Sequence, residues 1–131
     1  MVVDTSAIVA MMFEEPESHA ITRALESADA RVMSCATMLE ATMVLESRRA
    51  TGAHRVLDEL VRRLRLTAIP FDSVQYEVAC DAFRRFGKGR HAAGLNFGDC
   101  FAYALAIVRD DVLLFVGSDF GKTDVRSALG R

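Results

Sequence analysis

The chain has 131 residues, of which 51% are hydrophobic and 26% charged, with only 8 Gly and 2 Pro. This balance is typical of a folded globular domain and excludes a disordered or collagen-like chain. The apolar runs are far shorter than the roughly 20 residues that a membrane span needs, so we expect no membrane segment. A chain of this length can bury a stable core unaided, and we predict a single domain over residues 1–131.

The N-terminus and the cysteines indicate an intracellular protein. The first residues, Met1-Val2-Val3-Asp4, place an acid inside the first apolar run with no basic segment before it, which differs from a secretory signal. We therefore expect a cytoplasmic protein. The three cysteines, an odd number, stand in apolar stretches, and we predict that they are reduced core residues: Cys35, Cys80 and Cys100.

Apolar patterning predicts short strands that alternate with amphipathic helices. In chain order we expect a strand at 2–3, helices at 7–13 and 18–28, a strand at 31–34, helices at 36–50 and 53–64, a strand at 66–69, helices at 73–86 and 96–108, a strand at 112–116, and a weak last strand near Val125. Such strands, apolar throughout, are typical of a parallel sheet covered on both faces. We therefore predict an α/β fold, a three-layer α/β/α domain with four or five short parallel strands.

Two acids follow directly on predicted strands. Asp4 comes after the strand at 2–3, and Asp119 comes after the strand at 112–116 and the turn Gly117-Ser118. Open α/β sheets bind ligands at the carboxyl ends of their strands, so both positions are candidate ligands. The structural alternatives are a helix cap for Asp4 and a turn residue for Asp119.

Two further acids lie on predicted helices among apolar neighbours. Glu40 has mainly apolar residues on its helix face, so we expect it to point into the protein, whereas Glu46 has polar neighbours and is predicted to lie on the surface. Asp99 opens a helix whose next residues, 100–108, carry no charge, so this helix is predicted to be buried on most sides. Glu40 could instead pair with a buried arginine, and Asp99 could serve the helix dipole.

Together the four acids predict a cation site. At one edge of a parallel sheet, strand ends and helix ends meet, so we expect the four carboxylates to converge. Two charges about 5 Å apart repel by about 3 kcal/mol at an effective dielectric near 20, so a cation must lie between them. Oxygen donors favour Mg²⁺, with Mn²⁺ as a substitute, over zinc. Ser6 and Asn96 could orient a carboxylate or a metal-bound water, or could cap a helix.

Four motifs carry a family resemblance. They are the N-terminal Val3-Asp4-Thr5-Ser6, the segment Thr37-Met38-Leu39-Glu40-Ala41, the run Leu95-Asn96-Phe97-Gly98-Asp99-Cys100, and Gly117-Ser118-Asp119-Phe120. In order and spacing they resemble the PIN-domain ribonucleases, above all the VapC toxins of type II toxin–antitoxin pairs. One departure is Val116, where relatives often carry a basic residue.

The resemblance implies function and partners. It implies that Asp4, Glu40, Asp99 and Asp119 are the catalytic metal-site acids, with Ser6 and Asn96 as polar support and Asp124 as an outer acid. It implies Mg²⁺-dependent cleavage of RNA phosphodiester bonds, a VapB-type antitoxin that blocks the site, and a homodimer that forms hetero-oligomers with the antitoxin. A metal-activated water suits such hydrolysis and requires no protein nucleophile.

An acidic site repels the RNA backbone, so basic residues elsewhere must attract it. We predict that Lys88, Arg90 and His91, in the glycine-containing loop ahead of Asn96, contact RNA. Two other basic groups stay open. Arg84 and Arg85 suit either a solvated helix face or RNA contact, and the cluster Arg62, Arg63 and Arg65 suits either a plain surface or an antitoxin contact.

Two other functions fit the pattern less well. A phospho-receiver domain requires an Asp at the end of a mid-chain strand and a Lys after the last strand, whereas this chain has Pro70 and Val116 there. A non-catalytic metal- or RNA-binding regulatory module of the same fold would not require the complete acidic set. The sequence therefore favours a nuclease.

Overall fold

The computed structural model describes residues 1–48 and 52–130 of the chain. In these residues six α-helices surround a four-stranded parallel sheet. The elements in chain order are β1 (Val2–Val3), α1 (Thr5–Met12), α2 (Ser18–Ser27), β2 (Arg31–Ser34), α3 (Cys35–Arg48), α4 (Ala53–Arg63), β3 (Leu66–Ile69), α5 (Ser73–Phe86), α6 (Phe97–Val108), β4 (Leu113–Leu114) and the short 3-10 helix η1 (Phe120–Lys122). The strand order is β3-β2-β1-β4, so β1 lies between β2 and β4.

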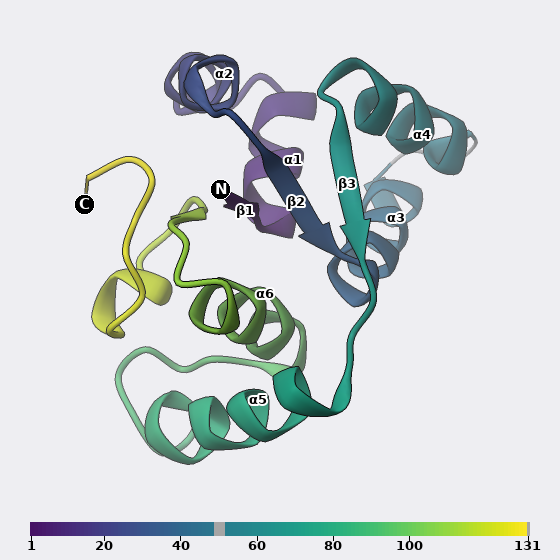
Figure 1. Ribbon diagram of the computed structural model, residues 1–131. Helices are drawn as coiled ribbons and strands as arrows, with labels where there is room; N and C mark the ends of the chain where they lie inside the picture. The colour runs from purple at the N-terminus through teal and green to yellow at the C-terminus, as the bar shows by residue number, and fades with distance from the viewer. Residues whose placement is uncertain (49–51, 131) are drawn as a thin grey trace.

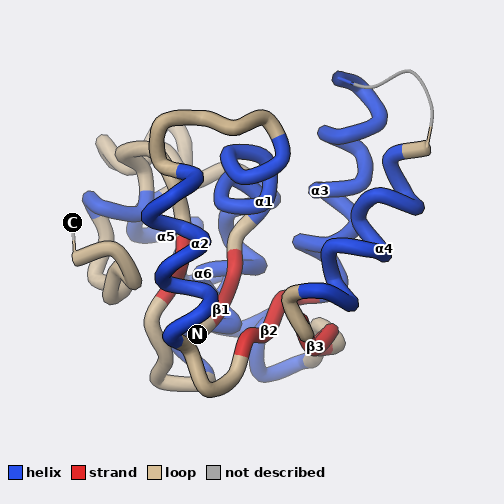
Figure 2. Tube along the Cα trace, turned by 90° about the horizontal axis from the view of Figure 1, so that it is seen from above, coloured by secondary structure: helices blue, strands red, loops and turns tan. Residues whose placement is uncertain are grey.

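Helices cover both faces of the sheet, as predicted. Successive residues of a strand point to opposite faces, and here Val2 and Leu113 contribute to the core beneath α5 and α6. Val3 and Leu114 contribute to a second core beneath α1 to α4. Figure 1 shows α5 and α6 together on one side of the strands, and Figure 2 shows α3 and α4 side by side. The domain is the expected three-layer α/β/α arrangement.

Helix starts are set by side-chain caps. The helix predicted to start at residue 7 begins at Thr5, because the Asp4 carboxylate accepts a hydrogen bond from the Ser6 backbone N–H and caps the helix. Helix α6 begins at Phe97 because Asn96 is its N-cap. Both caps lie at the same edge of the sheet, where β1 ends and α6 begins.

The last predicted strands are shorter in the structure. Strand β4 contains only Leu113 and Leu114 instead of 112–116. In place of the weak strand near Val125, a single parallel bridge joins Leu113 to Ser127. The predicted helix end at residues 49–50 lies outside the described residues.

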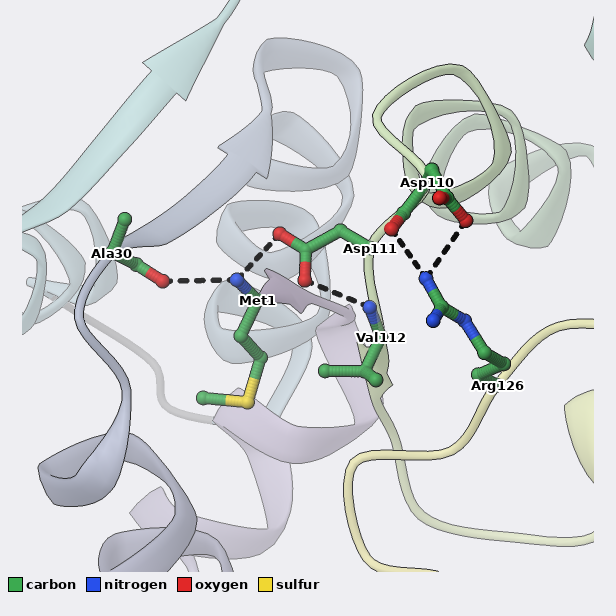
Figure 3. A network of polar contacts seen from close by, with 6 residues as sticks. All are labelled: Met1, Ala30, Asp110, Asp111, Val112 and Arg126. Carbon is green, nitrogen blue, oxygen red and sulfur yellow. Dashed lines mark hydrogen bonds and ion pairs between the residues drawn. The ribbon is translucent and has the colours of Figure 1, made fainter.

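Polar contacts fix the opposite edge of the sheet, where β1 begins (Figure 3). The Met1 ammonium group donates to the Ala30 carbonyl oxygen at 2.9 Å and to the Asp111 carboxylate at 2.6 Å. The second Asp111 oxygen accepts from the Val112 N–H at 2.8 Å. One carboxylate thus holds the start of β1 beside the start of the β4 segment.

The cysteine prediction is wrong for one of the three residues. Cys100 is buried and Cys80 is partly buried, but Cys35 is exposed at the first position of α3. All three are free thiols. In the part of the chain that the structure describes, no helix has the length and apolar character to span a membrane.

Candidate acidic metal site

A cleft of about 340 Å³ opens where β1, α3 and α6 meet. Strand β1 connects onward to β2 on one side and pairs with β4 on the other, so its carboxyl end is the point where the strand order reverses, the usual ligand position in such sheets. Three of the four predicted acids line the cleft. Its lining residues are Asp4, Thr5, Ser6, Val9, Glu15, Glu40, Val44, Arg48, Asp99, Val116 and Gly117.

Asp4 is the most deeply buried of the acids, with only 4% of its surface exposed. Its Oδ2 accepts hydrogen bonds from the Ser6 N–H at 2.9 Å and the Ser6 hydroxyl at 2.6 Å. Its Oδ1 is buried without a hydrogen-bond partner among the described residues. Burial raises the pKa of Asp4 and the charge of Glu40 adds to the rise, although the Ser6 bonds oppose it. A buried carboxylate oxygen with no partner marks a place for a cation.

Glu40 reaches the same cleft from α3. The Thr5 hydroxyl donates to Glu40 Oε2 at 2.7 Å and also lies 3.2 Å from the Thr37 carbonyl oxygen. Glu40 is half-buried, and Met43 on the same helix face is 62% exposed, so this face forms the edge of the cleft and is not fully inward as predicted. Glu46 lies on the surface as expected.

The end of the Glu40 side chain lies against Gly98, in the first turn of α6. A Cβ at position 98 would lie 2.0 Å from Glu40 Oε1, so only glycine leaves room for the carboxylate there. The next residue along the helix is Asp99. This contact brings an acid of α3 beside an acid of α6.

Asp99 and Asn96 cap α6 reciprocally. The Asp99 carboxylate accepts from the Asn96 N–H at 2.8 Å, while the Asn96 side-chain oxygen accepts from the Asp99 N–H at 3.0 Å. Burial raises the pKa of Asp99 to about 6. The Asn96 bond opposes this rise, and the charges of Asp4, Glu40 and Asp119 increase it. Asn96 therefore caps α6, and its backbone N–H holds the Asp99 carboxylate.

The structure places the last two predicted acids outside the cleft lining. Asp119 is exposed, yet lies close enough for its charge to raise the pKa of Asp99. Asp124 points elsewhere and accepts from the Tyr103 hydroxyl and from the Arg85 guanidinium, both at 2.5 Å. The structure thus brings Asp4, Glu40 and Asp99 together, leaves Asp119 at the margin, and engages Asp124 in a separate network.

The donor set fits a hard divalent cation. Every candidate ligand is a carboxylate oxygen, the type of donor that Mg²⁺ and Mn²⁺ prefer. Within residues 1–48 and 52–130, no three Asp, Glu, His or Cys side chains already form a closed set of metal ligands. A cation at this site would need these side chains to move closer together, and the buried Asp4 oxygen without a partner among the described residues is the observation that favours one.

The predicted RNA contacts lie in the exposed loop between α5 and α6. Lys88, Arg90 and His91 are all exposed. The Lys88 N–H donates to the Leu95 carbonyl oxygen at 2.9 Å, which holds the two ends of the loop together. Lys88 therefore lies beside the segment that leads into Asn96 and Asp99.

Sequence reasoning missed several residues of the site. Thr5 stands in the first motif with no role in the site predicted for it, although its hydroxyl donates to Glu40. Gly98 and the backbone of Val116 were also missed; the Val116 N–H donates to the Ser6 hydroxyl oxygen at 3.0 Å. A glycine in the first turn of an otherwise uninterrupted helix was a usable signal. No sequence signal could have indicated the Val116 contact, because the donor is a backbone N–H, which every residue except proline has.

Comparison with known proteins identifies the family. The family model of the PIN domain matches residues 1–126. The chain belongs to the PIN-domain family. This PIN domain is 46% identical over 132 residues to "Ribonuclease VapC28" of Mycobacterium tuberculosis, which covers 100% of this chain and 99% of that protein. It is also 46% identical over 125 residues to "Ribonuclease VapC" of Mycolicibacterium smegmatis, which covers 95% and 97% of the two chains.

A solved structure confirms the fold of this PIN domain. The crystal structure of Mycobacterium tuberculosis VapC20, described as a "Sarcin-Ricin loop cleaving toxin", superposes with a TM-score of 0.72 at 17% identity and covers 95% of this chain and 98% of that one. The resemblance found from the four motifs is therefore confirmed, and the chain is a PIN domain of the VapC group.

Proposed function

We propose that this PIN domain is a Mg²⁺-dependent endoribonuclease toxin that hydrolyses RNA phosphodiester bonds. The observation that carries the proposal is the buried, unpartnered Oδ1 of Asp4 in a cleft that it shares with Glu40 and Asp99. The names of relatives 46% identical over nearly the whole chain, each called a ribonuclease, support RNA as the substrate.

Each side chain of the cleft has a role in this function. Asp4 and Asp99 would hold the ion, with Glu40 and Asp119 as further ligands or as groups that position the attacking water. A bound Mg²⁺ would lower the pKa of that water and neutralise charge on the leaving oxygen. Ser6 fixes one oxygen of Asp4, and the other oxygen is buried without a partner among the described residues. Asn96 fixes Asp99 in the same way.

The RNA backbone would be attracted by the exposed loop between α5 and α6. Lys88, Arg90 and His91 would contact phosphates next to the cleft. The Arg90 guanidinium lies 5.3 Å from the centre of the Phe83 ring, and the His91 ring packs edge-on against Phe86 with 5.3 Å between centroids. Because these contacts already restrict the Arg90 and His91 side chains, RNA binding would cost less conformational entropy.

The proposed partners are a VapB-type antitoxin and a second copy of the chain, in hetero-oligomers. Support for an interface comes from apolar side chains exposed around a hollow between α5 and α6. Phe97 is 81% exposed and Tyr76 is 54% exposed, an unusual exposure for a lone domain. The dimer is tested by measuring the mass of the wild type and of Phe97→Ser by light scattering. A monomer mass for both proteins would contradict the dimer.

The decisive experiment incubates the purified protein with labelled RNA in Mg²⁺ and in chelator. We expect cleavage in Mg²⁺ only, and loss of cleavage in Asp4→Asn. The control is Glu46→Gln, which removes an exposed acid of α3 outside the cleft. RNA binding without cleavage under all metal conditions would instead support the non-catalytic module. Full cleavage in Asp4→Asn would refute the assigned site.

A further inference from the structure

Among the described residues that line the acidic cleft, Arg48 is the only cation. It lies on the same face of α3 as Glu40 and Val44, which also line the cleft, because residues four apart in a helix lie above one another. Arg48 follows Glu40 by eight positions, which is about 12 Å along the helix axis. Helix α3 therefore forms one side of the cleft, with the Glu40 carboxylate and the Arg48 guanidinium at different points along it.

Two contacts hold the Arg48 side chain at this position. Its guanidinium lies 3.7 Å from a carboxylate oxygen of Glu15 and 5.1 Å from the centre of the Phe13 ring. The backbone under Glu15 is itself fixed, because the Glu15 N–H donates to the Ala10 carbonyl oxygen at 2.9 Å. The turn after α1 thus restricts the orientation of the Arg48 guanidinium in the lining of the cleft.

The Arg48–Glu15 pair is not explained by a contribution to the stability of the fold. The Arg48 and Glu15 side chains are 49% and 38% exposed, and an exposed pair contributes little stability, typically below about 1 kcal/mol. A guanidinium has five N–H donors, and in the described part of the chain Arg48 contacts only one carboxylate and one ring. The other N–H donors of Arg48 therefore remain for a ligand with several acceptor oxygens.

A phosphate is the ligand that these features select. The cleft carries the carboxylates of Asp4, Glu15, Glu40 and Asp99, of which only Glu15 pairs with Arg48, so a negatively charged strand that enters it gains from the cation in its lining. Guanidinium groups bind phosphate through two parallel hydrogen bonds. We infer that Arg48 binds an RNA phosphate that flanks the scissile one, and so sets the register of the strand across the carboxylates. This inference rests on the proposed function.

The first test measures RNA affinity in an Asp99→Asn background, which keeps the RNA intact. We expect Arg48→Ala to weaken binding of a short single-stranded RNA about tenfold. It should also lower the slope of log affinity against log salt by about 0.7, the value for one lost phosphate contact. Arg48→Lys keeps the charge and is expected to retain the slope. The matched control is Arg62→Ala, which removes an arginine 73% exposed and paired with Glu59 outside the cleft.

The second test locates the phosphate. It uses a set of RNAs, each with one neutral methylphosphonate linkage near the mapped cleavage site. The affinity of each RNA is measured for the protein with Arg48 and for Arg48→Ala, both in the Asp99→Asn background. We expect one linkage next to the cleavage site to weaken binding when Arg48 is present and to have no effect in Arg48→Ala. Unchanged affinity and slope in Arg48→Ala, or equal losses in Arg48→Ala and Arg48→Lys with lowered melting temperatures, overturn the inference. Wild-type cleavage in Mg²⁺ is measured in parallel, because its absence refutes the proposed function and not only the role of Arg48.

Discussion

The carboxylate of Glu40 packs against the bare Cα of Gly98, with no space between them for even a methyl group. One contact therefore joins α3 to the first turn of α6 and places Glu40 next to Asp99. Glu40 is also bonded to the Thr5 hydroxyl at 2.7 Å, so it connects the segments that carry Asp4, Glu40 and Asp99.

Gly98→Ala is expected to reduce RNA cleavage at least tenfold with little change in melting temperature. The new methyl group would displace the end of the Glu40 side chain, which is flexible, and would break its bond to Thr5. The cost of this displacement is offset because alanine favours a helix over glycine by about 1 kcal/mol. Cleavage rates and thermal melts of the same preparations check this. The control is Gly121→Ala, where a methyl group meets no atom within 4 Å; equal activity in the two variants would contradict the prediction.

Asp99→Asn is expected to raise the melting temperature of the metal-free protein at pH 7.5 while it abolishes cleavage. The pKa of Asp99 is raised to about 6 by burial and by its acidic neighbours. Between about pH 4 and pH 6 the folded state therefore binds more protons than the unfolded state, and stability falls as pH rises. Asparagine carries no charge and avoids this loss.

Melts across pH 4 to 8, with and without Mg²⁺, check the Asp99 prediction. The gap between Asp99→Asn and wild type should close towards pH 4, and Mg²⁺ should raise the melting temperature of wild type more than that of the variant. Glu46→Gln, at an exposed position, should show neither effect. A variant that is less stable than wild type at pH 7.5 without metal would show that Asp99 is a structural residue.

Asp111→Asn is expected to destabilise the fold by about 1.5–3 kcal/mol, the typical range for a hydrogen bond to a charged group. Asp111 holds the Met1 ammonium at 2.6 Å, and the Met1 side chain is only 5% exposed. Burial alone would raise the pKa of Asp111, but the Met1 ammonium and the Val112 N–H lower it overall. Its contribution is therefore present above about pH 4 and is lost as pH falls through the lowered pKa.

The neighbouring Asp110 supplies the control for this prediction. It pairs with Arg126 at 2.9 Å but is 96% exposed, so Asp110→Asn should change the free energy of unfolding by less than about 0.5 kcal/mol. Urea denaturation of both variants measures the difference. Equal stability in the two variants would mean that the Met1 contact contributes nothing.

The parts of the fold that the sequence predicts well are those with strong local signals. Apolar strands without alternation indicate a sheet covered on both faces, and the observed layers agree because Val2 and Val3 point into two different cores. The Asp4 and Asn96 positions carry cap residues, and both cap helices. In the site, Asp4 and Asp99 follow from position alone, since strand ends and helix starts meet at one edge of a parallel sheet.

The parts that could not be predicted depend on contacts between distant segments. The fit of Glu40 against Gly98 requires the exact separation of α3 and α6, which no local pattern encodes. Cys35 stands in an apolar stretch, yet the first turn of α3 exposes it. The bonds of Asp124 to Arg85 and Tyr103 join positions 39 and 21 residues apart, so no local pattern around Asp124 indicates them.

Asp124→Asn and Tyr103→Phe separate a structural network from the metal site. Tyr103 is 2% exposed and its hydroxyl donates to Asp124, which also binds Arg85 of α5. These bonds tie the C-terminal segment to α5 and α6, and they lower the pKa of Asp124 against the opposing effect of its burial.

Each substitution should lower the melting temperature by a few degrees, the change that corresponds to about 1 kcal/mol in a domain of this size. Cleavage per folded molecule should stay within about twofold of wild type, because neither residue lines the acidic cleft. If Asp124→Asn abolished cleavage while Tyr103→Phe did not and both melted normally, Asp124 would belong to the metal site after all, as the family resemblance implies.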